Sequence, residues 1–173
     1  MSHGSTALRT LVVSLGLLAA ACTMIARAAP PSSGINRSFE DAPHWRAPAA
    51  LWLTPEGDTL FVACSKSGGV SILDTAKSEF ITESPLGKSL AAMAATPDGN
   101  TLAVVDAGAD ELLIVDRHGR EINLRARVAM PTKPTIVVLD RDGRYCFVAS
   151  RWSRVVSRVD LAAGKMAGTV AVD

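Results

Sequence analysis

The chain has 173 residues, 48% of them hydrophobic, and 18 Lys and Arg nearly balance 17 Asp and Glu to give a net charge of +1. Such a balance creates no strong field toward nucleic acid or anionic lipid, so we expect neither as a nonspecific partner. The apolar residues are unevenly distributed, because one block of them lies near the amino terminus.

Residues 1–28 have the features of a signal peptide. A basic residue precedes the apolar run Leu11–Ala21, which is too short to cross a ~30 Å hydrocarbon core as a helix. An A-x-A cleavage site at 26–28 would release a soluble chain, whereas the segment ending at Cys22 resembles a bacterial lipobox and would make Cys22 a lipidated membrane tether. An uncleaved anchor is a third alternative. Each of these predicts export, to the periplasm or the cell surface.

Residues 29–48 contain several Pro and Ser residues and form the next segment. This composition predicts a surface linker between the signal and the folded part of the chain.

A ten-residue phrase then occurs three times. It reads TPEGDTLFVA at 54–63, TPDGNTLAVV at 96–105 and DRDGRYCFVA at 140–149. Its glycines are spaced 42 and 44 positions apart: Gly57, Gly99 and Gly143. A second marker keeps the same spacing, an aspartate that ends a later apolar run: Asp74, Asp116 and Asp160. Two markers that hold one period indicate an internal repeat.

Each repeat contains four short apolar runs separated by Gly, Pro, Ser and Asp, the pattern of β-strands joined by tight turns. The runs are 51–54, 60–64, 70–73 and 80–81, then 92–95, 101–105, 112–115 and 126–130, then 135–139, 145–150, 155–159 and 168–172. Four strands in about 43 residues are one blade of a β-propeller. We therefore predict an all-β fold of three four-stranded antiparallel blades, at 49–89, 90–134 and 135–173.

The repeated phrase has the composition of the hairpin between the first and second strands of a blade. Pro97 presets φ for a type I turn, Asp98 suits the next position, and Gly99 takes the left-handed conformation of a three-residue loop. The third copy has Arg141 in place of the proline but keeps Gly143, so we expect it to turn as well.

The turn and the aspartate marker resemble the YVTN-type β-propeller repeat of exported bacterial and archaeal proteins, over residues 49–173. The tetrapeptide itself is degenerate, and reads FVAC at 61–64, AVVD at 103–106 and FVAS at 147–150. The resemblance implies a ring of seven or a similar number of blades, in the periplasm or on the cell surface, sometimes within longer chains that carry cytochrome domains.

Three blades are fewer than the four to eight with which propellers typically close, so the sequence predicts an incomplete propeller. Three explanations stay open: a piece of a longer protein that carries the remaining blades, several copies that assemble into one ring, or an arc that is stable by itself.

Propellers usually bind ligands on the face formed by the loops between second and third strands and by the connections between blades. The residues that we expect to present to a protein or small ligand there are Lys66, Asp106, Asp110, Arg151, Trp152 and Arg154. Trp152 between two arginines has the composition of an interaction hot spot. The alternative is that Trp152 covers the hydrophobic edge of the third blade while both arginines are solvated.

The acidic loop around Asp106 and Asp110 could hold a cation, but it lacks D-x-D-x-D-G spacing, so turn closure is the favoured interpretation. The repeated aspartates also have a structural interpretation, as hydrogen-bond acceptors at turns or strand ends. We predict that Cys64 and Cys146, which lie at different positions of the repeat, are too far apart for a disulfide. His44 and His118 are expected at the surface, and Trp52 in the core.

No C-x-x-C-H, G-x-S-x-G or H-E-x-x-H motif and no phosphate loop occurs, so we predict no catalytic residue, no metal ligand and no cofactor within this chain. The first functional hypothesis is an exported binding or scaffold module without catalysis of its own. The second is the amino-terminal part of a larger propeller oxidoreductase, cytochrome-associated electron-transfer protein or lactonase-like enzyme, whose active site lies outside this chain.

Overall fold

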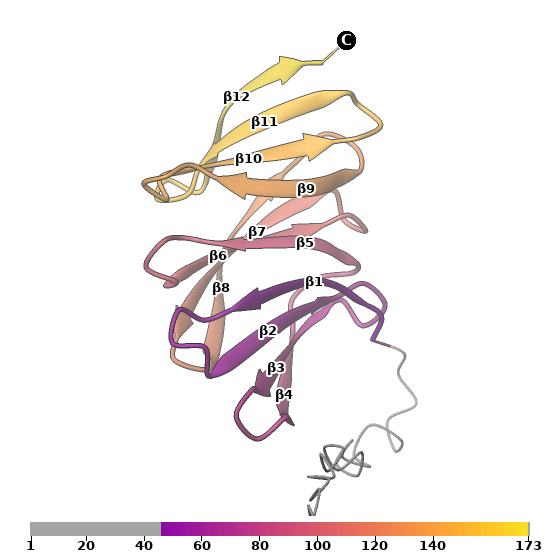
Figure 1. Ribbon diagram of the computed structural model, residues 1–173. Coiled ribbons are helices and arrows are strands. Elements are labelled where there is room, and N and C mark those ends of the chain that lie inside the picture. Colours follow the sequence, from indigo (N-terminus) through magenta and orange to yellow (C-terminus); the bar gives the residue numbers. More distant parts are fainter. Residues whose placement is uncertain (1–45, 173) are drawn as a thin grey trace, which may run out of the picture. The chain divides into compact units, whose positions relative to one another are not determined.

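The computed structural model describes residues 46–172, which contain twelve β-strands and no helix (Figure 1). The strands of the first sheet are β1 (Pro48–Leu53), β2 (Thr59–Cys64), β3 (Gly69–Asp74) and β4 (Glu79–Pro85). The second sheet has β5 (Leu90–Ala95), β6 (Thr101–Asp106), β7 (Glu111–His118) and β8 (Glu121–Ala129). The third has β9 (Pro134–Leu139), β10 (Tyr145–Ser150), β11 (Val155–Asp160) and β12 (Lys165–Ala171).

Each sheet is antiparallel and keeps its strands in chain order, so each is one blade, numbered 1 to 3 here. The first strands of successive blades lie against one another, β1 against β5 and β5 against β9. The predicted all-β fold with three four-stranded blades is confirmed. All twelve predicted strands have a counterpart.

The repeated phrase forms the predicted hairpin in all three blades. Gly57, Gly99 and Gly143 have φ of +75°, +68° and +69°, the left-handed region that glycine adopts without strain. The loop has four residues, not three, because the amide of Thr96 donates to the carbonyl of Thr101 and closes the hairpin around 97–100. The carboxylate of Asp98 accepts hydrogen bonds from the Thr96 hydroxyl and the Asn100 amide, which lower its pKa.

Two boundaries differ from the sequence prediction. Residues 46–48 belong to blade 1 rather than to the linker, because the carbonyls of Arg46 and Ala47 accept hydrogen bonds from the β2–β3 loop. In blade 2 the hairpin between β7 and β8 turns at Gly119, and β8 begins at Glu121, five positions before the predicted start. The extra residues alternate between polar side chains and the apolar Ile122 and Leu124, and Ile122 is buried in the first core cluster.

The apolar core consists of two interfaces between blades. The first interface joins blades 1 and 2 and the second joins blades 2 and 3. Blade 2 contributes to both. In β6, Leu102 and Val104 enter the first interface, while Ala103 and Val105 enter the second. Because neighbouring side chains on a strand point to opposite faces, a blade packed on both sides has central strands that are apolar without interruption.

Trp52 is a core residue, as predicted, although it is only partly buried. Its ring lies 5.5 Å from that of Phe61 in the same blade. Arg117 belongs to blade 2, across the first interface from Trp52. Its guanidinium carbon lies 5.4 Å from the centre of the Trp52 ring. A cation beside an aromatic face is favourable, so this pair ties the two blades together.

Candidate functional site: the loop edge of the blades

The loops between second and third strands lie beside the connections between blades. In blade 2 the amide of Ala107 donates to the carbonyl of Ser89 (2.9 Å), and in blade 3 the amide of Arg151 donates to the carbonyl of Lys133 (2.9 Å). These bonds hold each loop against the connection that leads into its own blade. The expected arrangement of a loop edge is therefore present.

Asp106 is not presented on that edge, which corrects the expectation from sequence. Its side chain is fully buried, and its carboxylate accepts hydrogen bonds from the amides of Lys88 (2.7 Å), Ser89 (3.0 Å), Gly108 (3.0 Å) and Ala109 (3.2 Å). A carboxylate that receives four backbone amides fixes the loop and the interblade connection to each other. No atom of this side chain is exposed to a partner.

Asp110 is partly buried and has a local structural role. Its carboxylate accepts a hydrogen bond from the amide of Lys133 (2.8 Å), and its carbonyl accepts one from the amide of Met130 (2.8 Å). Both partners belong to the connection between blades 2 and 3. Asp110 therefore holds the acidic loop onto the next blade, and its neighbour Glu111 is paired with Arg127 at 2.8 Å.

Arg154 and Asp110 share an unusual backbone conformation with Gly68. The three residues end equivalent loops in blades 3, 2 and 1, and their φ values are +51°, +55° and +68°. Left-handed backbone is unstrained for glycine, tolerated by aspartate, and unfavourable for arginine. In blade 3 the strained residue is thus one of the candidate binding residues.

Arg151, Trp152 and Arg154 line one open depression of about 460 Å³. Trp152 is 76% exposed, so it does not cover the edge of blade 3. Among residues 46–172, neither of the two guanidinium groups has a carboxylate within ion-pair distance. The three side chains together offer an exposed indole and two cationic groups that no acidic side chain of the described segment neutralises.

Lys66 is exposed in the β2–β3 loop of blade 1, where its backbone amide donates to the carbonyl of Arg46 (3.0 Å). Of the six residues selected from the sequence, the structure groups Arg151, Trp152 and Arg154. Asp110 and the buried Asp106 are instead engaged with the interblade connections. No cluster of three His, Cys, Asp or Glu suited to a metal ion is found within residues 46–172.

Two of the repeated aspartates close turns, as expected. Asp74 accepts a hydrogen bond from the amide of Lys77 (2.9 Å), and Asp160 accepts one from the amide of Ala163 (2.9 Å). The Lys77 amide, together with Arg120, lowers the pKa of Asp74. Asp116 differs because β7 continues past it, and its carboxylate pairs with Arg125 at 3.0 Å.

Arginines that cross from blade to blade were missed by the sequence analysis. Arg120 reaches from blade 2 to Asp74 of blade 1 (2.8 Å), and Arg127 donates to the carbonyl of Leu86 (2.6 Å). Arg125 extends to the other side, to the carbonyl of Leu161 in blade 3 (3.0 Å). In a regular strand, residues two positions apart share one face. Arg125 and Arg127 face opposite neighbours because the β7–β8 pairing is irregular between them: Ala126 pairs with Ile114 and Leu124 with Val115, which leaves Arg125 as an extra residue.

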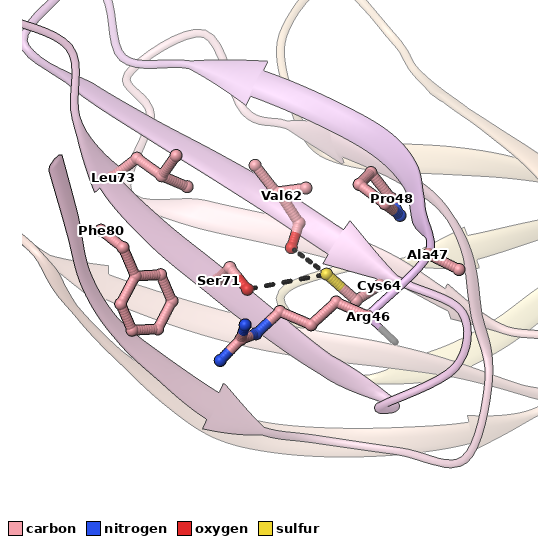
Figure 2. A pocket seen from close by; sticks show the side chains of 8 residues that line it. All are labelled: Arg46, Ala47, Pro48, Val62, Cys64, Ser71, Leu73 and Phe80. Atoms are coloured by element: carbon pink, nitrogen blue, oxygen red, sulfur yellow. Dashed lines mark hydrogen bonds between the residues drawn. The ribbon is translucent and has the colours of Figure 1, made fainter. Parts of the chain in front are cut away.

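A second depression, of about 390 Å³, lies on the face of blade 1 that is turned away from blade 2 (Figure 2). Its lining residues are Arg46, Ala47, Pro48, Val62, Cys64, Ser71, Leu73 and Phe80. Figure 2 shows the Arg46 side chain extending toward Phe80, whose ring centre is 4.8 Å from the guanidinium carbon. Arg46 also pairs with Glu83 at 2.6 Å, so it is held across this face.

Both cysteines in the described segment are buried thiols that are not bonded to each other. The Cys64 thiol lies 3.5 Å from the carbonyl oxygen of Val62 and 3.6 Å from the hydroxyl of Ser71. Burial raises the pKa of the Cys146 thiol to about 12. A thiol with such a high pKa is a poor nucleophile, so Cys146 is a packing residue of the second interface.

Comparison with known proteins shows the fold. Hydrazine synthase of Kuenenia stuttgartiensis matches with a TM-score of 0.69 at 20% identity, over 76% of this chain and 37% of that one. The periplasmic gluconolactonase of Pseudomonas aeruginosa matches with a TM-score of 0.64 at 17% identity, over 72% and 39%. A β-propeller domain from Myceliophteria thermophila matches with a TM-score of 0.64 at 15% identity, over 79% and 46%. The fold is that of a β-propeller.

The chain spans less than half the length of each of these propeller proteins. Its described residues form three blades, fewer than the four to eight of a closed propeller. No family model matches the chain, and no curated protein matches it by sequence. At identities of 20% and below, the likeness establishes architecture and assigns no activity to this chain.

Cys22 and His44 lie outside the described residues, as do the expected signal peptide and most of the linker. His118 is exposed at the end of β7, where no other candidate residue is found. Residues 46–172 include no helix with the length and apolar character needed to span a bilayer.

Proposed function

We propose that this chain is part of an exported, YVTN-type β-propeller that acts as a binding module through the loop edge of blade 3. The observation that carries the proposal is the exposure of Trp152 between two arginines that lack an acidic partner in the described segment. Trp and Arg are enriched at binding hot spots, and here one exposed Trp and two Arg line the same depression.

The chemistry of this cluster defines the partner class. Guanidinium groups pair best with carboxylates, often through two parallel hydrogen bonds, and the indole offers an apolar surface next to them. The partner that fits is a protein segment with an acidic residue beside an apolar or aromatic one. Lys66 contributes a further exposed cation on another loop.

The strained backbone of Arg154 supports this interpretation. A residue in the left-handed region at φ +51° costs stability that glycine would not cost, as Gly68 shows at the equivalent position of blade 1. An arginine at this strained position is consistent with a side chain that binds a partner rather than one that stabilises the folded chain.

A peptide array provides the test. The full chain, as purified from expressing cells, would be applied to arrayed peptides that combine Glu or Asp with Leu, Phe or Trp, and to matched peptides with Lys instead. We expect binding to the acidic peptides only, and loss of binding in the triple variant R151A, W152A and R154A. Arg141→Ala, which removes an exposed arginine from the β9–β10 hairpin at another loop, is the control and should bind normally. Equal binding by the triple variant would refute the proposed site.

The proposed location follows from the sequence of residues 1–28. We propose export by the signal peptide, with Cys22 as the lipid attachment site if the lipobox-like segment is used. Metabolic labelling of expressing bacteria with a fatty acid distinguishes the two forms. Label in the wild-type chain and none in Cys22→Ala would identify the lipoprotein, whereas an unlabelled chain in the soluble periplasmic fraction would identify A-x-A cleavage.

A second candidate function is membership of a larger propeller enzyme. The observation in its favour is that the similar structures include a gluconolactonase and hydrazine synthase, each more than twice as long as the matched part of this chain. In that case the chemistry would reside in blades or domains beyond these three. Reading the genomic frame after codon 173 tests it: further blades followed by C-x-x-C-H would favour a redox protein, and further blades followed by a stop codon would favour the binding module.

A further inference from the structure

The loop edge is one continuous surface across the three blades. Five segments form it, the β2–β3, β6–β7 and β10–β11 loops at 65–68, 107–110 and 151–154 and the connections between blades at 86–89 and 130–133. Each segment is bonded to the next. The amide of Leu86 donates to the carbonyl of Gly68 (3.2 Å), and the amide of Lys133 donates to the carboxylate of Asp110 (2.8 Å). The other two junctions are the bonds that hold the loops of blades 2 and 3 against their connections.

Every exposed charged side chain on these five segments is a cation. The cations are Lys66, Lys88, Lys133, Arg151 and Arg154. Two aspartates at the edge do not offset them, because Asp106 is fully buried among backbone amides and Asp110 holds the connection into blade 3. Among residues 46–172, none of the five cations lies within ion-pair distance of a carboxylate. The edge is therefore positive, although the whole chain has a net charge of only +1.

The opposite edge of the same blades carries exposed residues of both signs. Its turns are the hairpins between first and second strands and between third and fourth strands. Their exposed acidic residues are Glu56, Asp58, Asp98 and Asp142, and their exposed basic residues are Lys77, Arg120, Arg141 and Arg144. A single sign of charge is therefore a property of the loop edge and not of the turns in general.

The centre of the loop edge has only small side chains. The β6–β7 loop begins Ala107-Gly108-Ala109, and its backbone packs closely on the preceding connection, since a Cβ added to Gly108 would lie 2.9 Å from the Cβ of Ser89. Exposed lysines lie on the connections to either side, Lys88 before blade 2 and Lys133 after it. The Nζ atom of Lys133 lies 3.5 Å from the carbonyl oxygen of Ala107. A chain that crosses this loop meets a cation on each side of it.

We propose that the loop edge binds an extended acidic segment of a partner protein, which crosses blade 2 between Lys88 and Lys133 and places an apolar residue on Trp152. This inference rests on the proposed function, because the cluster of blade 3 is one end of the site. Sheets packed face to face lie ~10 Å apart and an extended peptide advances ~3.3 Å per residue, so one acidic residue in about three matches the step between the two connections. Neutral residues between the acids suit the small side chains of the β6–β7 loop.

The contribution of the lysines is electrostatic. Exposed pairs of lysine and carboxylate are weak singly, act mainly on the association rate, and are screened by salt. Lys88 and Lys133 should therefore matter most at low ionic strength, whereas the apolar contact with Trp152 should persist at high ionic strength.

Fluorescence anisotropy with the full chain, purified from expressing cells, tests the proposal. Three labelled peptides are compared: a short one with Glu beside Trp, the same peptide extended by about eight residues with Glu at every third position, and a matched extension with Gln. We expect the Glu extension to tighten binding about tenfold at low ionic strength, and the Gln extension to leave it unchanged. The gain from Glu should shrink as NaCl is added.

A pair of double variants locates the effect. Lys88→Gln with Lys133→Gln should remove the gain from the Glu extension and leave the short peptide bound. Lys77→Gln with Lys165→Gln removes the same charge from exposed positions near the opposite edge and should keep the gain. All four lysines are exposed, so circular dichroism should show intact folding in both variants.

The outcomes separate this inference from the proposed function. Equal binding of the Glu and Gln extensions, or an equal loss in both double variants, would overturn the inference. Tighter binding of a polyphosphate of matching charge would overturn the assignment to a protein segment. A short peptide that does not bind would refute the proposed role of the blade 3 cluster, while a gain from Glu that depends on Lys88 and Lys133 would still support the acidic segment.

Discussion

The first and second interfaces are built from the same repeat but are stabilised differently. The first contains two aromatic residues, Trp52 and Phe61, and is crossed by Arg117, Arg120 and Arg127. Within the described residues, the apolar cluster of the second contains no aromatic side chain and several alanines, and Arg125 is the arginine that crosses it. A repeat thus fixes which positions are buried, while the size of the side chains and the polar contacts vary from interface to interface.

The largest expected effect is at Phe61, the fully buried aromatic residue of the first interface. Phe61→Ala should lower the free energy of unfolding by about 3–5 kcal/mol, because a fully buried phenyl group is replaced by a cavity. Phe147→Ala, at the same repeat position of blade 3 but 36% exposed, should cost about 1 kcal/mol or less. Urea denaturation of both variants checks the comparison. Equal losses would show that burial by the next blade does not set the energetics of this position.

The next effect contrasts Asp106 with its repeat equivalent Ser150. Asp106→Ala should destabilise the chain by about 2–4 kcal/mol, because four backbone amides lose a buried acceptor. The hydroxyl of Ser150 is buried without a hydrogen-bond partner in the described structure, so Ser150→Ala should be neutral or slightly stabilising. Thermal melting monitored by circular dichroism at fixed pH measures both. A destabilised Ser150→Ala would mean that its hydroxyl is engaged after all.

A smaller effect is expected where Arg120 crosses the first interface. Arg120→Ala should raise the pKa of Asp74 toward its ordinary value, since one of the groups that stabilise the carboxylate is removed. Because the pKa of Asp74 is lower in the folded chain than in the unfolded chain, its contribution to stability is present above about pH 4 and is lost as the pH falls through the folded pKa. Carboxyl NMR titration reports the shift. Once Asp74 is protonated, the wild-type chain loses the stabilising contribution of this carboxylate. The difference in melting temperature between wild type and Asp74→Asn should therefore shrink as the pH falls below about 4.

The smallest expected effect is at Arg154, on the loop edge of blade 3, where the backbone strain of the residue and the binding role of its side chain can be tested separately. Arg154→Gly should stabilise the chain by about 0.5–1 kcal/mol, because glycine adopts φ near +51° without strain. The same variant should lose affinity for acidic peptides. Gly68→Ala is the reverse change at the equivalent position of blade 1 and should destabilise strongly, since the added Cβ would clash with the carbonyl oxygen of Gly87 and alanine is strained at φ +68°. If Arg154→Gly were less stable than wild type, the side chain would contribute to the fold.

The candidate site was only partly accessible from sequence. Loop position follows from the repeat, so Arg151, Trp152 and Arg154 could be selected as variable residues on a common edge. Asp106 was selected by the same reasoning, and it is buried, because its accessibility depends on the amides of Lys88 and Ser89, which fold back from the preceding connection. Nothing in the local sequence specifies that contact between residues 17 and 18 positions apart.

The sequence by itself determined the strands, the turns and the number of blades. These depend on local chemistry: a glycine where φ is positive, an aspartate that accepts amides at a turn, and an apolar pattern repeated every 42 to 44 residues. Only the tertiary structure decided which apolar residues are covered. Phe61 and Phe147 have the same place in the repeat, and they differ in exposure because a blade packs on the first and none of the described segment packs on the second.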